Sequence, residues 1–109
     1  MDSVRKLKAG IFQGLAHPTR LAIVELVMER ERSVGEIFNL LGIEQPTISQ
    51  HLAILRARRI VTSRKAGNQV FYSLRDPVLK RVLDLMRRYT VSHLTEDLAL
   101  LEEMEDEAR

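Results

Sequence analysis

A glycine and a proline four positions apart constrain the fold of this chain more than any other feature. Gly42 follows the apolar pair Leu40-Leu41, and Pro46 stands at the start of the stretch QPTISQHLAIL. Glycine adopts the left-handed conformation that ends a helix, and proline suits the first turn of one. The sequence therefore predicts two helices joined by a tight turn, the first ending at Gly42 and the second beginning near Pro46.

The first of these two helices has a recognisable start. In SVGE, residues 33–36, the serine hydroxyl can accept a hydrogen bond from the amide three residues on, and the glutamate can reach back. We expect Ile37, Leu40 and Leu41 to form the inner face of this helix.

Two more helices are predicted before residue 33. Apolar residues at helical spacing from Val4 to Leu15 indicate an amphipathic first helix. Pro18 then begins a second helix, which is apolar over most of its girth and so belongs at the centre of a small domain. Its last turn, residues 29–32, is expected to return to solvent.

The helix over residues 45–57 has two unlike faces. Ile48, Leu52 and Leu55 form one apolar stripe. The opposite face is polar near its start, small further on and free of acids, with Pro46, Ser49, Gln50, Ala53 and Ala57. A plain solvated face would more often carry Glu and Lys. This face therefore favours a helix that enters a groove on a polyanion.

The rest of the chain is predicted as a hairpin and one long helix. Residues 60–74 change to a period of two around the turn Ala66-Gly67-Asn68, which indicates a β-hairpin with a basic, polar tip. Asp76-Pro77 opens a last helix with an apolar stripe from Leu79 to Leu101, and residues 102–109 are expected to fray.

Charge is distributed unevenly along the chain. Residues 1–88 hold 16 Lys and Arg against 8 Asp and Glu, whereas residues 89–109 hold one Arg against 7 acids. The basic part could attract a polyanion, although a solvated surface of mixed sign would look similar.

Length and composition set further limits. A chain of 109 residues fits a single domain, residues 1–109. It has no cysteine, which excludes disulfides and thiolate metal sites. No apolar run has the roughly 20 residues that a membrane-spanning helix needs, and no export signal is evident, so a cytoplasmic setting is expected.

These elements predict a mainly α fold with a β-hairpin wing, in the order of a winged helix-turn-helix. The sequence resembles the ArsR/SmtB-type bacterial transcriptional repressors. LAHPTRLAIVELV is similar to the second helix of that family, QPTISQHLAIL to its recognition helix and RKAGNQVFYSL to its wing. The resemblance covers roughly residues 7–90.

The resemblance, together with groove geometry, implies that the helix over 45–57 lies in the major groove of double-stranded DNA. The expected base-reading residues are Gln45, Thr47, Ser49 and Gln50. Gln50 is favoured because an amide can pair bidentately with adenine. Helix capping or solvation is the plain alternative for Thr47 and Ser49.

A second set of residues is expected at the DNA backbone: His51, Arg56, Arg64, Lys65, Asn68 and Gln69. Such contacts position a protein without reading sequence. His51 lies beside the core stripe, so it is either packed or in contact with a phosphate. Arg20 either pairs with a carboxylate at a helix start or contacts the backbone.

The first and last helices carry apolar stripes that one small domain cannot bury, which predicts a two-fold homodimer on an imperfect palindrome. The expected interface residues are Leu7, Ile11, Leu79, Val82, Met86, Tyr89, Leu94 and Leu98.

Repressors of the resembled family commonly release DNA when an inducer binds. Their cysteine metal site cannot form here, because Ser33 and Gly35 stand in the matching segment. A second metal site of the family uses Asp and His ligands on paired last helices. This site is lost as well, because Val78, Tyr89 and Ser92 stand where histidines or acids would be expected. No cofactor or metal is therefore expected and the inducer is unknown, although His93, Glu96 and Asp97 share a helix face that could form a variant site across a dimer.

Three rival classes of function compete with a DNA-binding repressor. An enzyme is not expected, because the three histidines fall on separate elements and no nucleophile stands beside an evident base. A winged helix that binds protein instead of DNA is the main alternative. An activator is also compatible with the same DNA contacts.

Overall fold

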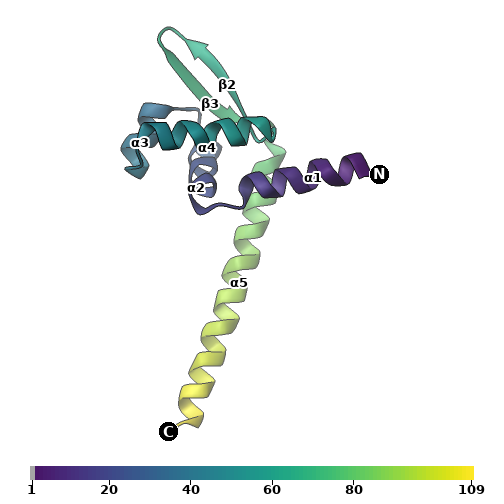
Figure 1. The fold of residues 1–109 in the computed structure, drawn as a ribbon. Coiled ribbons are helices and arrows are strands. Elements are labelled where there is room, and N and C mark those ends of the chain that lie inside the picture. Colours follow the sequence, from purple (N-terminus) through teal and green to yellow (C-terminus); the bar gives the residue numbers. More distant parts are fainter. Residues whose placement is uncertain (1) are drawn as a thin grey trace. The chain divides into compact units, whose positions relative to one another are not determined.

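The structure, a computed structural model, describes residues 2–109 and is mainly helical with a small antiparallel sheet (Figure 1). The elements in chain order are α1 (Asp2–Leu15), α2 (Pro18–Glu29), β1 (Arg32–Ser33), α3 (Val34–Leu41), α4 (Gln45–Ala57), β2 (Val61–Ala66), β3 (Gln69–Leu74) and α5 (Val78–Glu107). They form two compact units, one ending at Pro77 and the other spanning Val78–Arg109. This is the predicted winged helix-turn-helix class.

The core of the first unit lies where α2, α3 and α4 meet the start of β2. Its side chains are apolar and almost completely buried: Leu15, Ile23, Val24, Val27, Ile37, Ile48, Leu52, Leu55, Ile60 and Val61. Each helix contributes the stripe that its sequence period places on one face. The stripe of α4, predicted as Ile48, Leu52 and Leu55, is confirmed.

The turn between α3 and α4 forms as the sequence predicts. Ser33 Oγ accepts from the Glu36 amide at 3.2 Å, and Glu36 Oε1 accepts from the Ser33 amide at 3.4 Å, which completes the capping box. Gly42 ends α3 with φ of 69°, in the left-handed region. One expectation is wrong: Leu40 is 54% exposed, because α3 is only 8 residues long and buries a single turn at Ile37.

The sheet has the strand order β1-β3-β2. In the hairpin, Ala66 pairs with Gln69 across a two-residue turn, and Gly67 has φ of 61°. The short strand β1 was not predicted. It pairs Arg32 with Tyr72 of β3, which buries Arg32 instead of returning it to solvent. The buried guanidinium is satisfied by the Leu26 carbonyl at 3.2 Å and the Glu29 carboxylate at 2.8 Å.

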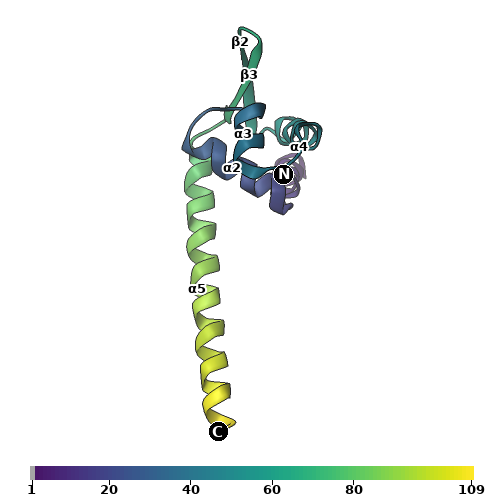
Figure 2. The same ribbon diagram turned by 90° about the vertical axis from the view of Figure 1, so that its left-hand side faces the viewer.

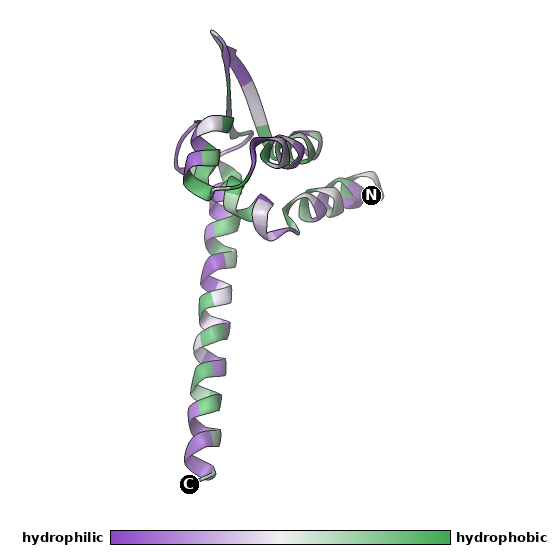
Figure 3. Cartoon of the chain, turned by 60° about the vertical axis from the view of Figure 1, so that its left-hand side comes forward, coloured by the Kyte–Doolittle hydropathy of each residue, from purple (hydrophilic) through white to green (hydrophobic). Residues whose placement is uncertain are grey.

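The second unit is the helix α5, which runs for 30 residues. The expected fraying after residue 101 is wrong, because Glu, Met and Ala favour helix and continue it to Glu107. None of its residues is buried, and hydrophobic residues recur along its length (Figure 3). No helix among residues 2–109 has the length and apolar character that crossing a membrane requires.

The charges of α5 run against its own dipole. A helix favours anions at its N-terminus and cations at its C-terminus. Its first half instead carries Lys80, Arg81, Arg87 and Arg88, and its second half carries 7 acids and no base.

Candidate nucleic-acid interface

The face of α4 opposite the core is open along its length. Ile48, Leu52 and Leu55 are 0% exposed, whereas Gln45, Ser49 and Gln50 are exposed. Thr47 is half-buried. Figure 2 shows α4 almost end-on at the edge of the first unit. The structure thus brings four predicted base-reading residues together at the start of one accessible helix.

Further along α4, the exposed side chains are those of Ala53, Ile54, Arg56 and Ala57, of which Ile54 is large and apolar. The alanine side chains of Ala53 and Ala57 protrude little from the helix, and Arg56 is exposed beside them. Arg58 instead lies against α1, where Gly10 and Gly14 leave room for its side chain. α4 ends at Ala57, and Arg59 beyond it has a φ of 62°, a left-handed conformation that favours glycine.

The hairpin β2–β3 projects away from α2, α3 and α4 (Figures 1 and 2). Lys65, Asn68 and Gln69 are exposed near its tip. These three predicted backbone-contact residues are therefore accessible to a ligand that approaches the wing.

Arg64 is on the same hairpin but already has a partner. Its Nε and Nη2 donate to the two carboxylate oxygens of Glu31 at 2.7 and 2.6 Å, and its guanidinium lies 5.1 Å from the centroid of the Phe71 ring. The hydrogen bond from Arg64 lowers the pKa of Glu31. Contact between Arg64 and a phosphate would require this bidentate ion pair to open.

His51 lies in a junction between three helices. Its Nδ1 is 3.4 Å from Nη1 of Arg20, and its ring centroid is 4.6 Å from that of His17. Burial lowers the pKa of His51, and the neighbouring His17 and Arg20 lower it further. This geometry favours the packed role of His51 over a phosphate contact.

Arg20 is a structural residue, but its partner is not a carboxylate. Its Nε donates to the Gly14 carbonyl at 2.6 Å, and its Nη2 donates to the Gln13 carbonyl at 3.2 Å. These are carbonyls of the last turn of α1, which carry partial negative charge. Arg20 therefore joins the C-terminus of α1 to α2 and α4.

The residues expected at a dimer interface lie on α1 and α5. Most of them are large, apolar and exposed in the single chain: Leu7 47%, Val82 43%, Met86 51%, Tyr89 69%, Leu94 56% and Leu98 61%. Ile11 and Leu79 are half-buried. Exposed apolar stripes of this length are typical of interaction surfaces.

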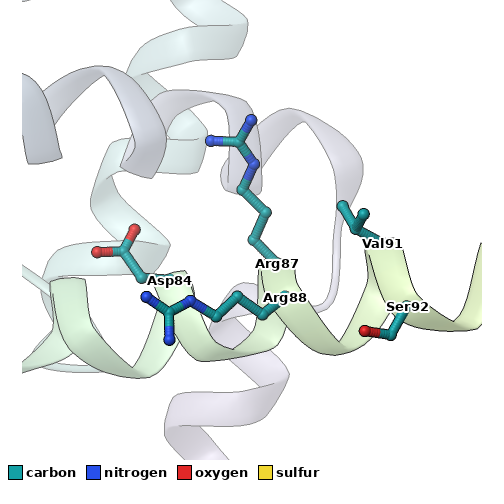
Figure 4. A pocket seen from close by; sticks show the side chains of 5 residues that line it. All are labelled: Asp84, Arg87, Arg88, Val91 and Ser92. Carbon is teal, nitrogen blue, oxygen red and sulfur yellow. The ribbon is translucent and has the colours of Figure 1, made fainter.

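The described residues 2–109 contain no group of three or more His, Asp or Glu side chains that could hold a metal ion. His93 stacks on Tyr89, with ring centroids 6.2 Å apart. A hollow on α5 is lined by Asp84, Arg87, Arg88, Val91 and Ser92 (Figure 4). All five side chains project from one helix, so they form an open flank and we assign no ligand to them.

Comparison with known proteins agrees with this geometry. A model of the ArsR family of bacterial regulatory proteins matches residues 17–63, which cover α2, α3, α4 and the start of the wing. The helix-turn-helix transcriptional regulator Rv0081 of Mycobacterium tuberculosis is 40% identical over 104 residues, which are 94% of this chain and 91% of that protein. The chain belongs to the ArsR family. This ArsR-family chain is thus a winged helix-turn-helix transcriptional regulator and not an enzyme, as the sequence predicted.

Further similar proteins extend the comparison. The crystal structure of Rv0081 has a TM-score of 0.80 at 38% identity, covering 87% of this ArsR-family chain and 96% of that one. A biofilm growth-associated repressor of Xylella fastidiosa is 39% identical over 76% of this chain and 71% of its own. The homodimeric winged helix-turn-helix DNA-binding domain Mb0332 of Mycobacterium bovis has a TM-score of 0.80 at 26% identity, over 85% and 86% of the two chains.

Two functional side chains were missed by the sequence analysis. His17 caps α2 by accepting a hydrogen bond from the Thr19 amide at Nδ1, at 3.1 Å. Its position directly before Pro18 marks an N-cap, although histidine is not a preferred residue there. Glu31 lies in the segment that the sequence predicts to return to solvent, and nothing in the local sequence indicates its pairing with Arg64.

Proposed function

We propose that this ArsR-family protein is a dimeric repressor that binds an imperfect DNA palindrome and is released by an inducer. The single observation that carries the proposal is the accessible, acid-free face of α4. Direct reading of bases would come from Gln45, Thr47, Ser49 and Gln50, with Gln50 pairing to adenine.

Contacts to the DNA backbone would flank the reading helix. Lys65, Asn68 and Gln69 would meet phosphates from the wing, and Arg56 from the end of α4.

Dimerisation would bury the apolar stripes of α1 and α5. Two antiparallel copies of α5 would also place the basic first half of each helix against the acidic second half of the other. This arrangement would remove the conflict between the charges of α5 and its dipole. Two recognition helices would then enter successive major grooves about one DNA turn apart.

The inducer would be a molecule that is not held by thiolates, because the chain has no cysteine. A metal held by His93, Glu96 and Asp97 of a dimer remains the alternative. Calorimetric titration with zinc, nickel and cobalt tests it, and the absence of heat above buffer would rule it out. We place the protein in the cytoplasm, where its DNA would be.

The decisive experiment is selection of duplexes from a random pool at pH 7.5, followed by a fluorescence anisotropy titration of the enriched duplex. We expect enrichment of a two-fold repeat. Failure to retain any duplex would refute DNA binding and favour a winged helix that binds protein. A promoter–reporter assay then distinguishes repression from activation.

Replacing Gln50 tests the reading helix itself. Gln50→Ala should remove about 1–3 kcal/mol of discrimination at one base pair in each half-site. Asn39→Ala, an exposed change on α3, is the control and should leave the selected sequence unchanged. An unaltered selected sequence for Gln50→Ala would exclude Gln50 as a base reader.

A further inference from the structure

Three helices meet at one small polar cluster, formed by His17, Arg20 and His51. α1 packs against both α2 and α4 in this unit. α1 faces the cluster with the carbonyls of Gln13 and Gly14, which accept from Arg20. His51 belongs to the recognition helix and directly follows Gln50.

The hydrogen bonds fix which atoms of the two rings carry protons. A guanidinium can only donate, so Nδ1 of His51 must be an unprotonated acceptor for Arg20 at 3.4 Å. The Thr19 amide also can only donate, so Nδ1 of His17 must be an unprotonated acceptor at 3.1 Å. Both rings are therefore neutral in this arrangement.

We propose that His17, Arg20 and His51 are positioning residues that hold the recognition helix against α1, and that protonation of either ring releases it. The inference rests on the proposed DNA binding by α4. A fall in pH would then be a second signal that weakens DNA binding. It would act by loosening the packing of α4, and not by occupying an inducer site.

Protonation would break the cluster in two ways. A proton on Nδ1 of His51 turns the acceptor into a donor and places a cation beside Arg20. A proton on Nδ1 of His17 removes the cap of α2. When both rings are protonated, the two cations, with ring centroids 4.6 Å apart, also repel each other. The recognition helix would lose its polar tie to α2 and, through Arg20, to the end of α1.

The surroundings of His51 set the direction of the response. The charged or titratable groups that act on it are His17 and Arg20, both cationic or able to become so. Together with burial they lower the pKa of His51 below its ordinary value. The stability that its neutral ring contributes is therefore complete above pH 6.5 and is lost as the pH falls through the lowered pKa.

The test exploits the fact that the chain has three histidines. Asparagine places an oxygen acceptor near the position of Nδ1 but cannot take up a proton. We would measure affinity for the selected duplex by fluorescence anisotropy from pH 5.0 to 8.0 for wild type, His17→Asn, His51→Asn and the double variant. Asn39→Ala, an exposed change on α3, is the control.

We expect wild type and Asn39→Ala to lose affinity on the order of tenfold between pH 7.5 and 5.0, since two protomers must keep neutral rings. The double variant should retain near wild-type affinity at pH 7.5 and lose much less on acidification. Affinity that rises on acidification would instead identify His51 as a phosphate contact and overturn the proposal. An equal loss in the double variant would also overturn it.

A second measurement does not depend on DNA. Nitrogen NMR of the imidazoles at pH 7.5 should show Nδ1 unprotonated in His17 and His51, and protonation should shift the amide resonances of α4. A proton on Nδ1 of His51 at pH 7.5 would show that this atom does not accept from Arg20, which would refute the proposal even if an asparagine variant failed to fold. Loss of all DNA binding by wild type at pH 7.5 would refute the proposed function, but the NMR measurement would still test the histidine cluster.

Discussion

Replacement of Lys65 by Gln should flatten the salt dependence of DNA binding, whereas replacement of Arg64 by Gln should not. Both residues are exposed bases on the same hairpin. Both carboxylate oxygens of Glu31 already hold Arg64, at 2.6 and 2.7 Å. Lys65 has no such anchor and remains available to a phosphate.

The size of the effect follows from counterion release. Each neutralised phosphate contributes about −0.9 to the slope of log affinity against log salt, so losing one contact from each of two wings changes it by about 1.8. Between 50 and 200 mM salt, Lys65→Gln should therefore lose about twelvefold less affinity than wild type. Arg64→Gln should keep the wild-type slope.

The assay is fluorescence anisotropy of the selected duplex at four or more salt concentrations. Asn39→Ala serves again as a control away from the wing. A slope that flattens by about 1.8 in Arg64→Gln would show that Arg64 leaves Glu31 for a phosphate on binding, and the argument from the ion pair would be wrong. An unchanged slope in Lys65→Gln would exclude a wing contact at Lys65.

Three further predictions concern stability, and chemical denaturation checks each of them. Leu52→Ala removes a side chain that is 0% exposed and should cost about 2–5 kcal/mol; a loss below 1 kcal/mol would contradict the packing of α4 on the core. Ser33→Ala breaks the capping box with Glu36 and should cost about 1–2 kcal/mol, and a neutral effect would mean that α3 does not depend on its cap. Arg59→Gly relieves a φ of 62° and should stabilise by about 0.5–1 kcal/mol, whereas destabilisation would show that the Arg59 side chain contributes more than the strain costs.

Local chemistry made the helix-turn-helix predictable. The capping box at Ser33, the left-handed Gly42 and the proline at Pro46 each act within a few residues, so each can be recognised without knowing the rest of the fold. The exposed face of α4 followed from helical period alone. These features fix where the candidate base-reading residues lie.

Contacts between distant segments could not be predicted in the same way. Glu31 and Arg64 are 33 residues apart, and Arg20 and His51 are 31 apart. Arg32 is buried because Tyr72 of β3 pairs with it, which no pattern near residue 32 indicates. The expected roles of Arg64 and His51 therefore changed most once the tertiary contacts were known.

In the proposed dimer, the charge pattern of α5 would tie the persistence of this helix to the concentration of partner molecules. A lone copy would keep an apolar stripe in water and anions at the unfavourable end of its dipole. Dilution should therefore lower the melting temperature, as mass action requires when folding and association are linked. In a cell, copy number would then govern how much of this regulator keeps its last helix.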